Sequence, residues 1–294
     1  SIGGDNAYLW FYTSIFELLA TKERELYIVK FAFWNVHQNT MINNYIVDLI
    51  YENGIDIIVL AEYNDHEQKL RNQLIDKGIY MEKYITSGCD RIKMYGSIQN
   101  VMPANQNKYY SVQIIDNKYI LCGMHLPSRI YSEHWERRNI VIDMIVADIN
   151  ELEKKFKLEN TIILGDINEN PYDSGCLNAT KFHGIPSGED AQKGSRSIMG
   201  KTFKMFYNPM WNLFGDFCYP PGTYYHNGSE PVNSFWNIYD QVMIRPGMKK
   251  CFVEKSLKII TDMQKYSLVD KLKHPRKDIS DHLPIVFEIK EERI

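Results

Sequence analysis

The 294-residue sequence contains little cysteine, and its cysteines follow no pattern. The five occur singly, without Cys-x-x-Cys spacing, at Cys89, Cys122, Cys176, Cys218 and Cys251. A disulfide framework and a cysteine-ligated zinc site both need paired or closely spaced cysteines. We therefore expect reduced, mostly buried thiols in a cytosolic compartment and neither of those two kinds of site.

Long hydrophobic runs are also missing. The apolar stretch at residues 9–12 is interrupted by Thr13, Ser14 and Glu17, and no basic residues precede it, so it does not resemble a signal peptide. It is too short to cross a bilayer, which requires ~20 apolar residues. These absences predict a cytoplasmic protein with no membrane partner.

A strong net charge of either sign is absent as well. The formal net charge is −3, so nothing attracts the molecule as a whole to a polyanion. A nucleic-acid partner would have to be held by a local basic surface or by a bound metal ion. Hydrophobic content of 44% and charged content of 24% are typical of an ordered globular chain.

The pattern of apolar residues predicts mixed α and β structure. Residues 6–22 have the apolar spacing of a helix, so we expect residues 1–24 to form an N-terminal helical extension to one domain at 25–294. Further helices are expected at 40–53, 65–77 and 133–156. Strands are expected at 27–33, 55–60, 84–86, 91–97, 111–115, 119–124, 161–164, 237–244 and 285–289.

One expected strand ends at Gly165-Asp166-Ile167-Asn168. In an extended backbone residues i and i+2 point to the same face, so Asp166 and Asn168 could address one water or phosphate oxygen. The acid would accept a proton while the amide fixes the oxygen. A turn in which both side chains bond their own backbone is the commoner meaning of this pattern, so the motif needs partners elsewhere.

Other expected strands also end in polar groups, which are Asn35, Glu62, His125, Asp281 and His282. A carboxylate directly after the apolar strand 55–60 is costly without a partner, and a metal ion is a natural one. A Glu62 side chain that simply reaches solvent is an equally simple explanation. Asp240 is expected inside a strand, where it could fix the tautomer of a neighbouring histidine.

The ordered set of motifs resembles the endonuclease/exonuclease/phosphatase superfamily, the deoxyribonuclease I and exonuclease III type of metal-dependent phosphohydrolase. The resemblance extends from about Tyr27 to Ile289. It is carried by Trp34-Asn35, Ala61-Glu62, His125-Leu126-Pro127, Gly165-Asp166-Ile167-Asn168, Tyr239-Asp240-Gln241 and Ser280-Asp281-His282. Each motif alone is weak, but six in family order are specific. The resemblance implies a four-layer α/β/β/α sandwich of two packed mixed sheets with the site at one edge.

The resemblance also implies a metal site and a water site. Glu62 would be the main Mg²⁺ ligand, with Asn35 beside it and Asp281 close enough to help. Oxygen ligands of this kind favour Mg²⁺ or Mn²⁺ over zinc. Asp166 would orient or deprotonate the attacking water, and Asn168 would hold it.

Phosphate contacts are implied on the other side of the reaction. His282, paired with Asp240, would contact the scissile phosphate, and His125 would bind a phosphate oxygen. Further candidate contacts to the substrate backbone are Ser128, Arg91 and Arg129, the basic loop 193–201 and Lys249-Lys250. For each basic residue taken singly, a solvated surface side chain is the commoner explanation.

Two positions depart from the abasic-site endonucleases of the superfamily. Those enzymes read Trp-Asn-x-Asp, whereas this chain has His37 in place of the aspartate, and they carry a tyrosine where this chain has His125. A dedicated abasic-site role is therefore disfavoured. We interpret His37 as a structural or phosphate-side residue and not as a metal ligand.

The leading functional interpretation is a Mg²⁺-dependent phosphodiesterase that acts on nucleic acid, with DNA favoured over RNA. One alternative is an enzyme for inositol or lipid phosphates or for adducts at DNA ends, because the shared site handles the phosphate while variable loops choose what is attached. Another is a degenerate binding module. The retained set of carboxylates and His282 argues against the degenerate module.

Overall fold

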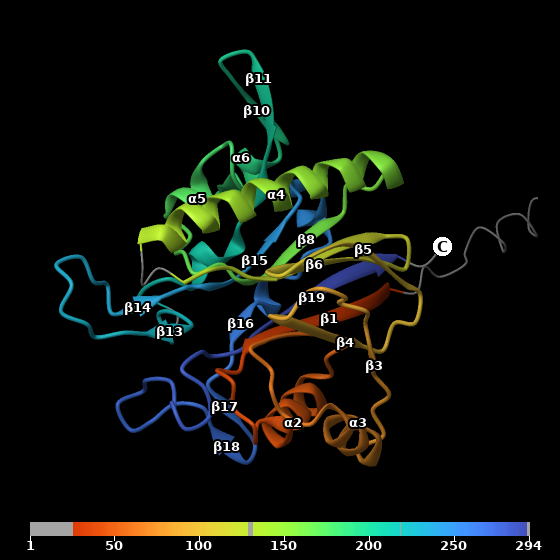
Figure 1. Cartoon of the computed structure of the whole chain (residues 1–294), viewed down its shortest axis with the longest axis vertical. Helices are drawn as coiled ribbons and strands as arrows, with labels where there is room; N and C mark the ends of the chain where they lie inside the picture. The colour runs from red at the N-terminus through yellow and green to blue at the C-terminus, as the bar shows by residue number, and fades with distance from the viewer. Residues whose placement is uncertain (1–25, 129–131, 218, 293–294) are drawn as a thin grey trace, which may run out of the picture.

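Two β-sheets packed face to face form the centre of the molecule, and helices cover their outer faces (Figure 1). The computed structural model describes residues 26–128, 132–217 and 219–292. The predicted helix at 6–22, with the extension 1–24, and also Arg129 and Cys218, lie outside the described residues. No helix in the described part of the chain combines the length and the apolar character that crossing a bilayer requires.

The first sheet has the strand order β16 (Lys258–Ile259), β19 (Ile285–Glu292), β1 (Leu26–Asn35), β2 (Ile57–Ala61), β4 (Ile92–Gly96) and β3 (Glu82–Lys83). β1 runs parallel to β2 and antiparallel to β19. The parallel register aligns Asn35 with Ala61, the residue before Glu62. The carboxyl ends of both strands therefore deliver their polar groups to one edge of the sheet.

The second sheet has the order β5 (Val101–Asn107), β6 (Tyr110–Ile115), β7 (Tyr119–His125), β8 (Thr161–Asp166), β15 (Asp240–Ile244), β12 (Phe206–Tyr207) and β9 (Gly184–Ile185). β7 is parallel to β8 and aligns His125 with Asp166. β15 is antiparallel to β8 and aligns Asp240 with Asp166. Three predicted site residues thus meet on neighbouring strands of this sheet.

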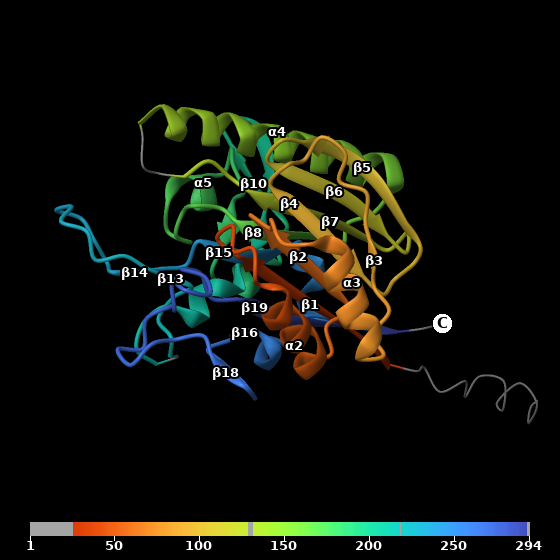
Figure 2. The same cartoon turned by 60° about the horizontal axis from the view of Figure 1, so that its bottom comes forward.

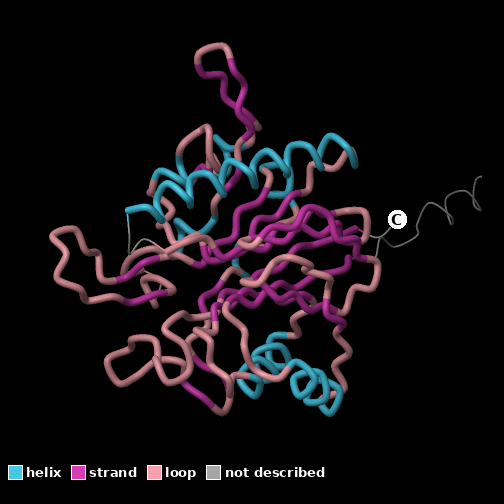
Figure 3. Tube along the Cα trace, viewed as in Figure 1, coloured by secondary structure: helices cyan, strands magenta, loops and turns pink. Residues whose placement is uncertain are grey.

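Three apolar clusters fill the spaces between the layers. One lies between the sheets, one packs the first sheet against α2 (Asn43–Asn53) and α3 (Glu67–Asp76), and one packs the second against α4 (Ser132–Phe156). Figure 2 shows α4 along the outer face of the second sheet, and Figure 3 shows helices on both sides of the strands. The predicted four-layer α/β/β/α sandwich is confirmed.

The remaining elements are short. They are α5 (Ser174–Leu177), α6 (Gly188–Ala191), the hairpins β10–β11 (Ser195–Ile198, Lys201–Lys204), β13–β14 (Tyr224–Tyr225, Trp236–Asn237) and β17–β18 (Asp262–Met263, Tyr266–Ser267), and the 3-10 helices η1 (Pro209–Leu213), η2 (Pro246–Lys250) and η3 (Glu254–Ser256). All of these elements follow residue 173. The β10–β11 hairpin projects from the body of the molecule (Figure 1).

Several strand predictions were wrong in detail. The strand predicted at 84–86 lies earlier, at β3. β5 was not predicted because it is polar and contains Pro103, which an edge strand tolerates, and its register shifts between Pro103 and Gln106. The strand predicted at 237–244 is divided into β14 and β15. Asp240 is consequently the first residue of β15 and does not lie inside a strand.

Candidate catalytic site

A series of short contacts connects predicted site residues from six segments at one edge of the sandwich. Glu62 contacts His125, His125 contacts Asp166, Asp166 contacts both Asn35 and His282, and His282 contacts Asp240. Five of them are the first or last residue of a strand or directly follow one, and His282 lies in the segment that leads into β19. The register of the two sheets therefore assembles this constellation from positions far apart in the chain.

Asp166 is the centre of the constellation. Its Oδ2 accepts a hydrogen bond of 3.0 Å from Asn35 Nδ2 and lies 3.6 Å from His125 Nε2 and 3.9 Å from His282 Nε2. The side chain is only 1% exposed. Burial, together with the Asp240 carboxylate, raises the pKa of Asp166 above its usual range, although the neighbouring His282 opposes this.

Asn168 follows Asp166 in a turn, and the extended geometry predicted for 166–168 is wrong. Asn168 has the left-handed φ of 55°, and its backbone N–H donates to Asp166 Oδ1 at 2.9 Å. Its Nδ2 donates to the Leu126 carbonyl at 2.9 Å. Within the described residues no donor reaches Asn168 Oδ1, so that oxygen remains for a water. The alternative in which this motif bonds its own backbone is thus realised for the Asp166 side chain but not for the Asn168 side chain.

His282 and Asp240 form a buried pair. Nδ1 of His282 lies 2.8 Å and 3.0 Å from the two carboxylate oxygens of Asp240. Burial by itself would lower the pKa of His282, but the Asp240 carboxylate outweighs it and raises the pKa to about 10. Trp34 Nε1 also donates to the His282 carbonyl at 3.0 Å. A fixed imidazolium therefore faces Asp166 at neutral pH.

His125 has the opposite electrostatic character. Burial lowers its pKa to about 4, despite the attraction of Asp166. Its Nε2 faces Glu62 Oε1 and Asp166 Oδ2, both at 3.6 Å. Its Nδ1 is buried and has no hydrogen-bond partner among the described residues. The site thus holds one neutral and one charged histidine on either side of one carboxylate.

Glu62 and Asp281 lie at the rim of the site beside one turn that follows Asn35. Gln38 Nε2 donates to Glu62 Oε2 at 3.3 Å, and His37 Nδ1 lies 3.2 Å from Asp281 Oδ1 without the alignment of a hydrogen bond. The carboxylate side chains are 24% and 18% exposed, so solvent or an ion can reach them. Asn35 Oδ1 accepts from the His37 N–H at 3.1 Å, which fixes the turn.

Besides the rim carboxylates, a second group of side chains, Asp166, Asp240 and His282, has the spacing of metal ligands. Asp166, Asp240 and His282 offer three ligand atoms within 4.8 Å of one another. Both oxygens of Asp240, however, face the His282 ring nitrogen, and an imidazole that carries two protons has no lone pair for a metal. This group is therefore better described as a hydrogen-bonded pair beside a carboxylate than as a metal site.

The other predicted phosphate contacts are dispersed. Arg91 stacks over the Tyr109 ring at 4.9 Å and lies close enough to lower the pKa of His125, and Ser128 is half-buried. The basic hairpin at 193–204 and Lys249-Lys250 are near the far end of β15, because β12 and the first residue of η2 adjoin Ile244 and Arg245. These two basic segments do not lie beside Asp240.

The close approach of β7 explains why a glycine precedes Asp166. A Cβ at this position would lie 2.1 Å from the Met124 carbonyl oxygen of the adjacent strand. Gly165→Ala is therefore expected to push β8 away from β7 and to lower the free energy of unfolding by about 3 kcal/mol. Urea unfolding measures this, with Gly247→Ala as the control because its Cβ would meet no atom within 4 Å. Equal stability of both variants would contradict the explanation.

A buried ion pair supports the backbone behind the site. Arg138 Nε donates to Glu169 Oε1 at 2.9 Å, Arg138 Nη1 donates to the Pro127 carbonyl at 3.1 Å, and Glu169 Oε2 accepts from the Gly175 N–H at 2.6 Å. The pair therefore ties α4 to the segments that follow His125 and Asn168. Both side chains are at most 2% exposed.

Removing one member of this pair is expected to be costly. Glu169→Ala leaves the Arg138 charge buried and unpaired, so the free energy of unfolding should fall by about 3–5 kcal/mol. Asp143, which is exposed on α4 and pairs with Lys181, serves as the control, and Asp143→Ala should cost less than about 1 kcal/mol. Urea unfolding of both variants tests this, and a loss at Glu169 no larger than at Asp143 would refute it.

Sequence reasoning missed the loop 270–278, which lies beside Asp281 and contains Lys271, Lys273, Arg276 and Lys277. The signal was present, since this is a dense basic segment directly before the Ser280-Asp281-His282 motif. Tyr224 was also missed, although its ring lies 4.8 Å from the His282 ring and its backbone forms a β-bridge to His282.

Comparisons with known proteins support the architecture. No sequence model of a protein family matches the chain, and no curated protein sequence matches it. An AP endonuclease from Archaeoglobus fulgidus has a similar structure, with a TM-score of 0.56 and 11% identity over 90% of this chain and 100% of that chain. The 3′ phosphatase NExo from Neisseria, bound to a product DNA hairpin, has a TM-score of 0.55 and 13% identity over 89% and 99% of the two chains.

A third similar structure comes from Bacteroides thetaiotaomicron and is described as an endonuclease/exonuclease/phosphatase family protein. It has a TM-score of 0.53 and 11% identity over 90% of this chain and 98% of that one. At such identities the similarity establishes the fold. The described chain has the fold of the endonuclease/exonuclease/phosphatase proteins.

Proposed function

We propose that the chain is a metal-dependent phosphodiesterase that hydrolyses phosphodiester bonds in nucleic acid, with DNA as the preferred substrate. The observation that carries this proposal is the contact between Asp166 and two histidines of opposite charge state, one of them held as a cation by Asp240. Acid, base and phosphate-binding groups are then present within one edge of the sandwich.

His282 has the chemistry of a phosphate contact. In-line attack on phosphorus builds negative charge on the non-bridging and leaving oxygens. The Asp240 carboxylate holds Nδ1 of His282, so Nε2 is free to donate to one of those oxygens. Fixed charged donors of this kind stabilise the transition state without reorganisation. His125, neutral and buried, can donate or accept one further hydrogen bond to the phosphate.

Asp166 and Asn168 have the chemistry of a water site. A carboxylate with a raised pKa is a better base than one at its usual value, and Asn35 fixes its orientation. Asn168 Nδ2 is held by the Leu126 carbonyl, and the amide oxygen would then accept a hydrogen bond from a water next to Asp166. The pair would align the nucleophile opposite the leaving group and take its proton.

A divalent cation fits the rim of the site. Glu62 and Asp281 offer partly exposed carboxylates, with the amide of Asn35 beside them, and hard oxygen ligands of this kind suit Mg²⁺ or Mn²⁺. When bound, the ion supplies Lewis-acid stabilisation of the phosphate charge. Asp281 Oδ1 at this rim has no hydrogen-bond partner among the described residues, so it is left for such an ion.

Support for a nucleic-acid substrate comes from the similar structures. One is an AP endonuclease, and another was solved with a product DNA hairpin. A phosphatase acting at DNA ends is the second candidate, because the protein with the hairpin is described as a 3′ phosphatase. The two activities differ only in what is attached to the scissile phosphate.

The test is cleavage of supercoiled plasmid and of linear single- and double-stranded DNA with Mg²⁺, Mn²⁺ or EDTA. We expect metal-dependent cleavage that is lost in Asp166→Ala and His282→Ala. A 3′-phosphorylated oligonucleotide in the same assay distinguishes end-trimming phosphatase activity from internal cleavage. Cleavage that persists in both variants, or that continues in EDTA, would disprove the proposed site. Release of phosphate from inositol phosphates without any cleavage of DNA would mean that the substrate is an inositol phosphate and not nucleic acid.

A further inference from the structure

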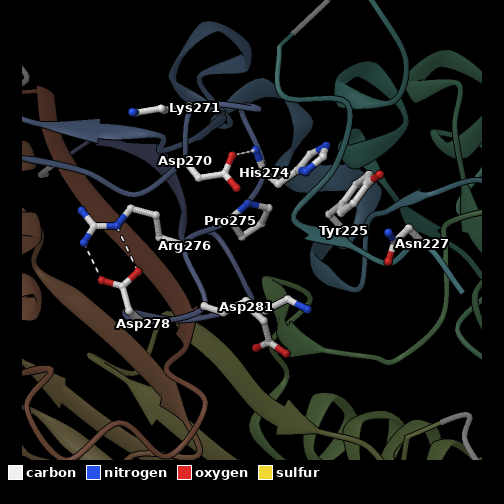
Figure 4. Close-up of a pocket in the computed structure, with 10 residues that line it drawn as sticks. Tyr225, Asn227, Asp270, Lys271, His274, Pro275, Arg276, Asp278 and Asp281 are labelled. Carbon is white, nitrogen blue, oxygen red and sulfur yellow. Dashed lines mark hydrogen bonds and ion pairs between the residues drawn. The ribbon is translucent and has the colours of Figure 1, made fainter.

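A cavity of about 560 Å³ opens beside the catalytic site (Figure 4). Asp281 lines it and is also one of the carboxylates at the rim of the catalytic site. The other walls come from the β13–β14 hairpin, through Tyr225 and Asn227, and from the loop 270–278. The volume is in the range of small-ligand pockets, about 300–1,000 Å³. A group attached to a phosphate in the catalytic site could therefore extend into this cavity.

Stacked rings form one wall of the cavity. The rings of Tyr225 and His274 are parallel within 10° with centroids 3.6 Å apart, and Figure 4 shows them side by side at the cavity wall. Trp236 contacts both rings edge-on, at 5.4 and 6.0 Å. Phe235 lies beyond Tyr225 at 6.5 Å and is 52% exposed. Four aromatic side chains therefore hold a flat surface next to the site.

The charged groups of the cavity are unevenly paired. Asp270 Oδ1 accepts from the backbone N–H groups of Leu272 and His274, and Arg276 is bound to Asp278. No carboxylate among the described residues pairs with the ammonium groups of Lys271 or Lys277. The loop 270–278, which also carries the His274 ring, therefore has two lysines that could bind an anionic group.

We propose that this cavity binds the nucleotide next to the scissile phosphate in a single-stranded segment of nucleic acid. Its base extends the Tyr225–His274 stack, and its own phosphate is held by Lys271 and Lys277. Stacking on aromatic side chains combined with basic groups along the backbone is how proteins hold single strands without reading their sequence. A base inside a duplex is already stacked on both faces, so this surface selects unpaired ends, gaps or loops. The inference rests on the proposed phosphodiesterase function.

The test measures binding separately from hydrolysis. Fluorescence anisotropy follows a labelled oligothymidylate of about ten nucleotides, and a blunt duplex of the same length, with the full chain in EDTA. Tyr225→Ala should weaken binding of the single strand by roughly 10-fold or more, since loss of one stacking partner has this size. Tyr225→Phe retains the ring and should retain binding. Tyr51→Ala is the control, because Tyr51 is 53% exposed on α2 with Lys77 over its ring, away from the cavity.

The salt dependence of binding tests the role of Lys271 and Lys277 independently of the stacking. Lys277→Ala should reduce the dependence of binding on salt by about one phosphate contact for the single strand. Unchanged affinity in Tyr225→Ala, or equal losses for single strand and duplex, would overturn the proposal. So would an inositol polyphosphate that displaces the oligonucleotide and depends on Lys271 and Lys277 but not on Tyr225.

A separate assay shows whether the proposed phosphodiesterase activity itself is absent. Turnover of bis(p-nitrophenyl) phosphate by the unmodified chain with Mg²⁺ or Mn²⁺ reports the phosphodiesterase without using the cavity. If that turnover is absent while the single strand binds in the Tyr225-dependent manner, the catalytic proposal fails and the binding site stands. If turnover is present and the Tyr225 dependence is absent, the cavity proposal alone fails.

Discussion

Replacing Asp240 with asparagine is expected to lower kcat/KM for nucleic-acid cleavage by about 10³-fold, because His282 then loses the carboxylate that keeps its ring protonated. The side chains of aspartate and asparagine have the same shape, so packing is preserved. The amide can no longer balance an imidazolium charge in a buried position. We expect a neutral imidazole whose second nitrogen no longer carries a positive charge toward the phosphate.

Kinetics and ring-nitrogen NMR check this expectation together. At neutral pH the wild-type His282 should show two protonated nitrogens, and in Asp240→Asn only one. Asp143→Asn is the matched control, since Asp143 lies on the exposed face of α4 and pairs with Lys181. An Asp240→Asn variant with wild-type kcat/KM, or with a doubly protonated His282, would show that the pair does not act as we infer.

The same pair predicts how stability depends on pH. The pKa of His282 is about 10 in the folded chain, above its ordinary value of 6.5, so folding favours the protonated form. This contribution is fully present below the unfolded pKa and is lost as pH rises through the folded pKa. The stability advantage of wild type over Asp240→Asn should therefore shrink as pH rises from 6.5 toward 10. Urea unfolding across this window measures it, and an advantage that grows with pH would refute it.

Much of the site was predictable from sequence because polar groups at strand ends converge once the strands align. Asn35, Glu62, His125 and Asp166 each follow an apolar segment, and parallel pairing within each sheet puts such ends at one edge. Sequence alone could not predict the turn at Asn168. Its left-handed φ depends on bonds to Asp166 and to Leu126, which is 42 residues earlier in the chain.

Loops that depend on tertiary contacts were the least predictable part. The β13–β14 hairpin consists of two short strands without apolar alternation, and its position beside His282 rests on a β-bridge from Tyr224. The stack of Tyr225 on His274 joins residues that are 49 positions apart in the sequence, so no local sequence pattern could predict it. The basic loop 270–278 was visible as composition but not as a wall of a cavity.

Glu62→Gln is expected to weaken Mg²⁺ binding and to lower metal-dependent turnover by about 10³-fold, because a neutral amide attracts a hard cation much less strongly than a carboxylate does. The substitution keeps the side-chain length and leaves an oxygen that can still accept from Gln38. The fold should therefore be unaffected, and isothermal titration with Mg²⁺ should lose its heat of binding while the unfolding midpoint without metal stays the same.

The matched control is Glu67→Gln on α3, where the carboxylate binds Lys83 on the surface and takes no part in the site. It should bind Mg²⁺ and turn over substrate as wild type does. Mn²⁺ binds to a weakened set of ligands more readily than Mg²⁺ does. Excess Mn²⁺ should therefore recover part of the activity of Glu62→Gln but none of the activity of Asp166→Ala. This difference follows from their separate tasks, since Glu62 would hold the ion whereas Asp166 would activate the water. Equal losses without any recovery in both variants would instead mean that the two carboxylates serve one task.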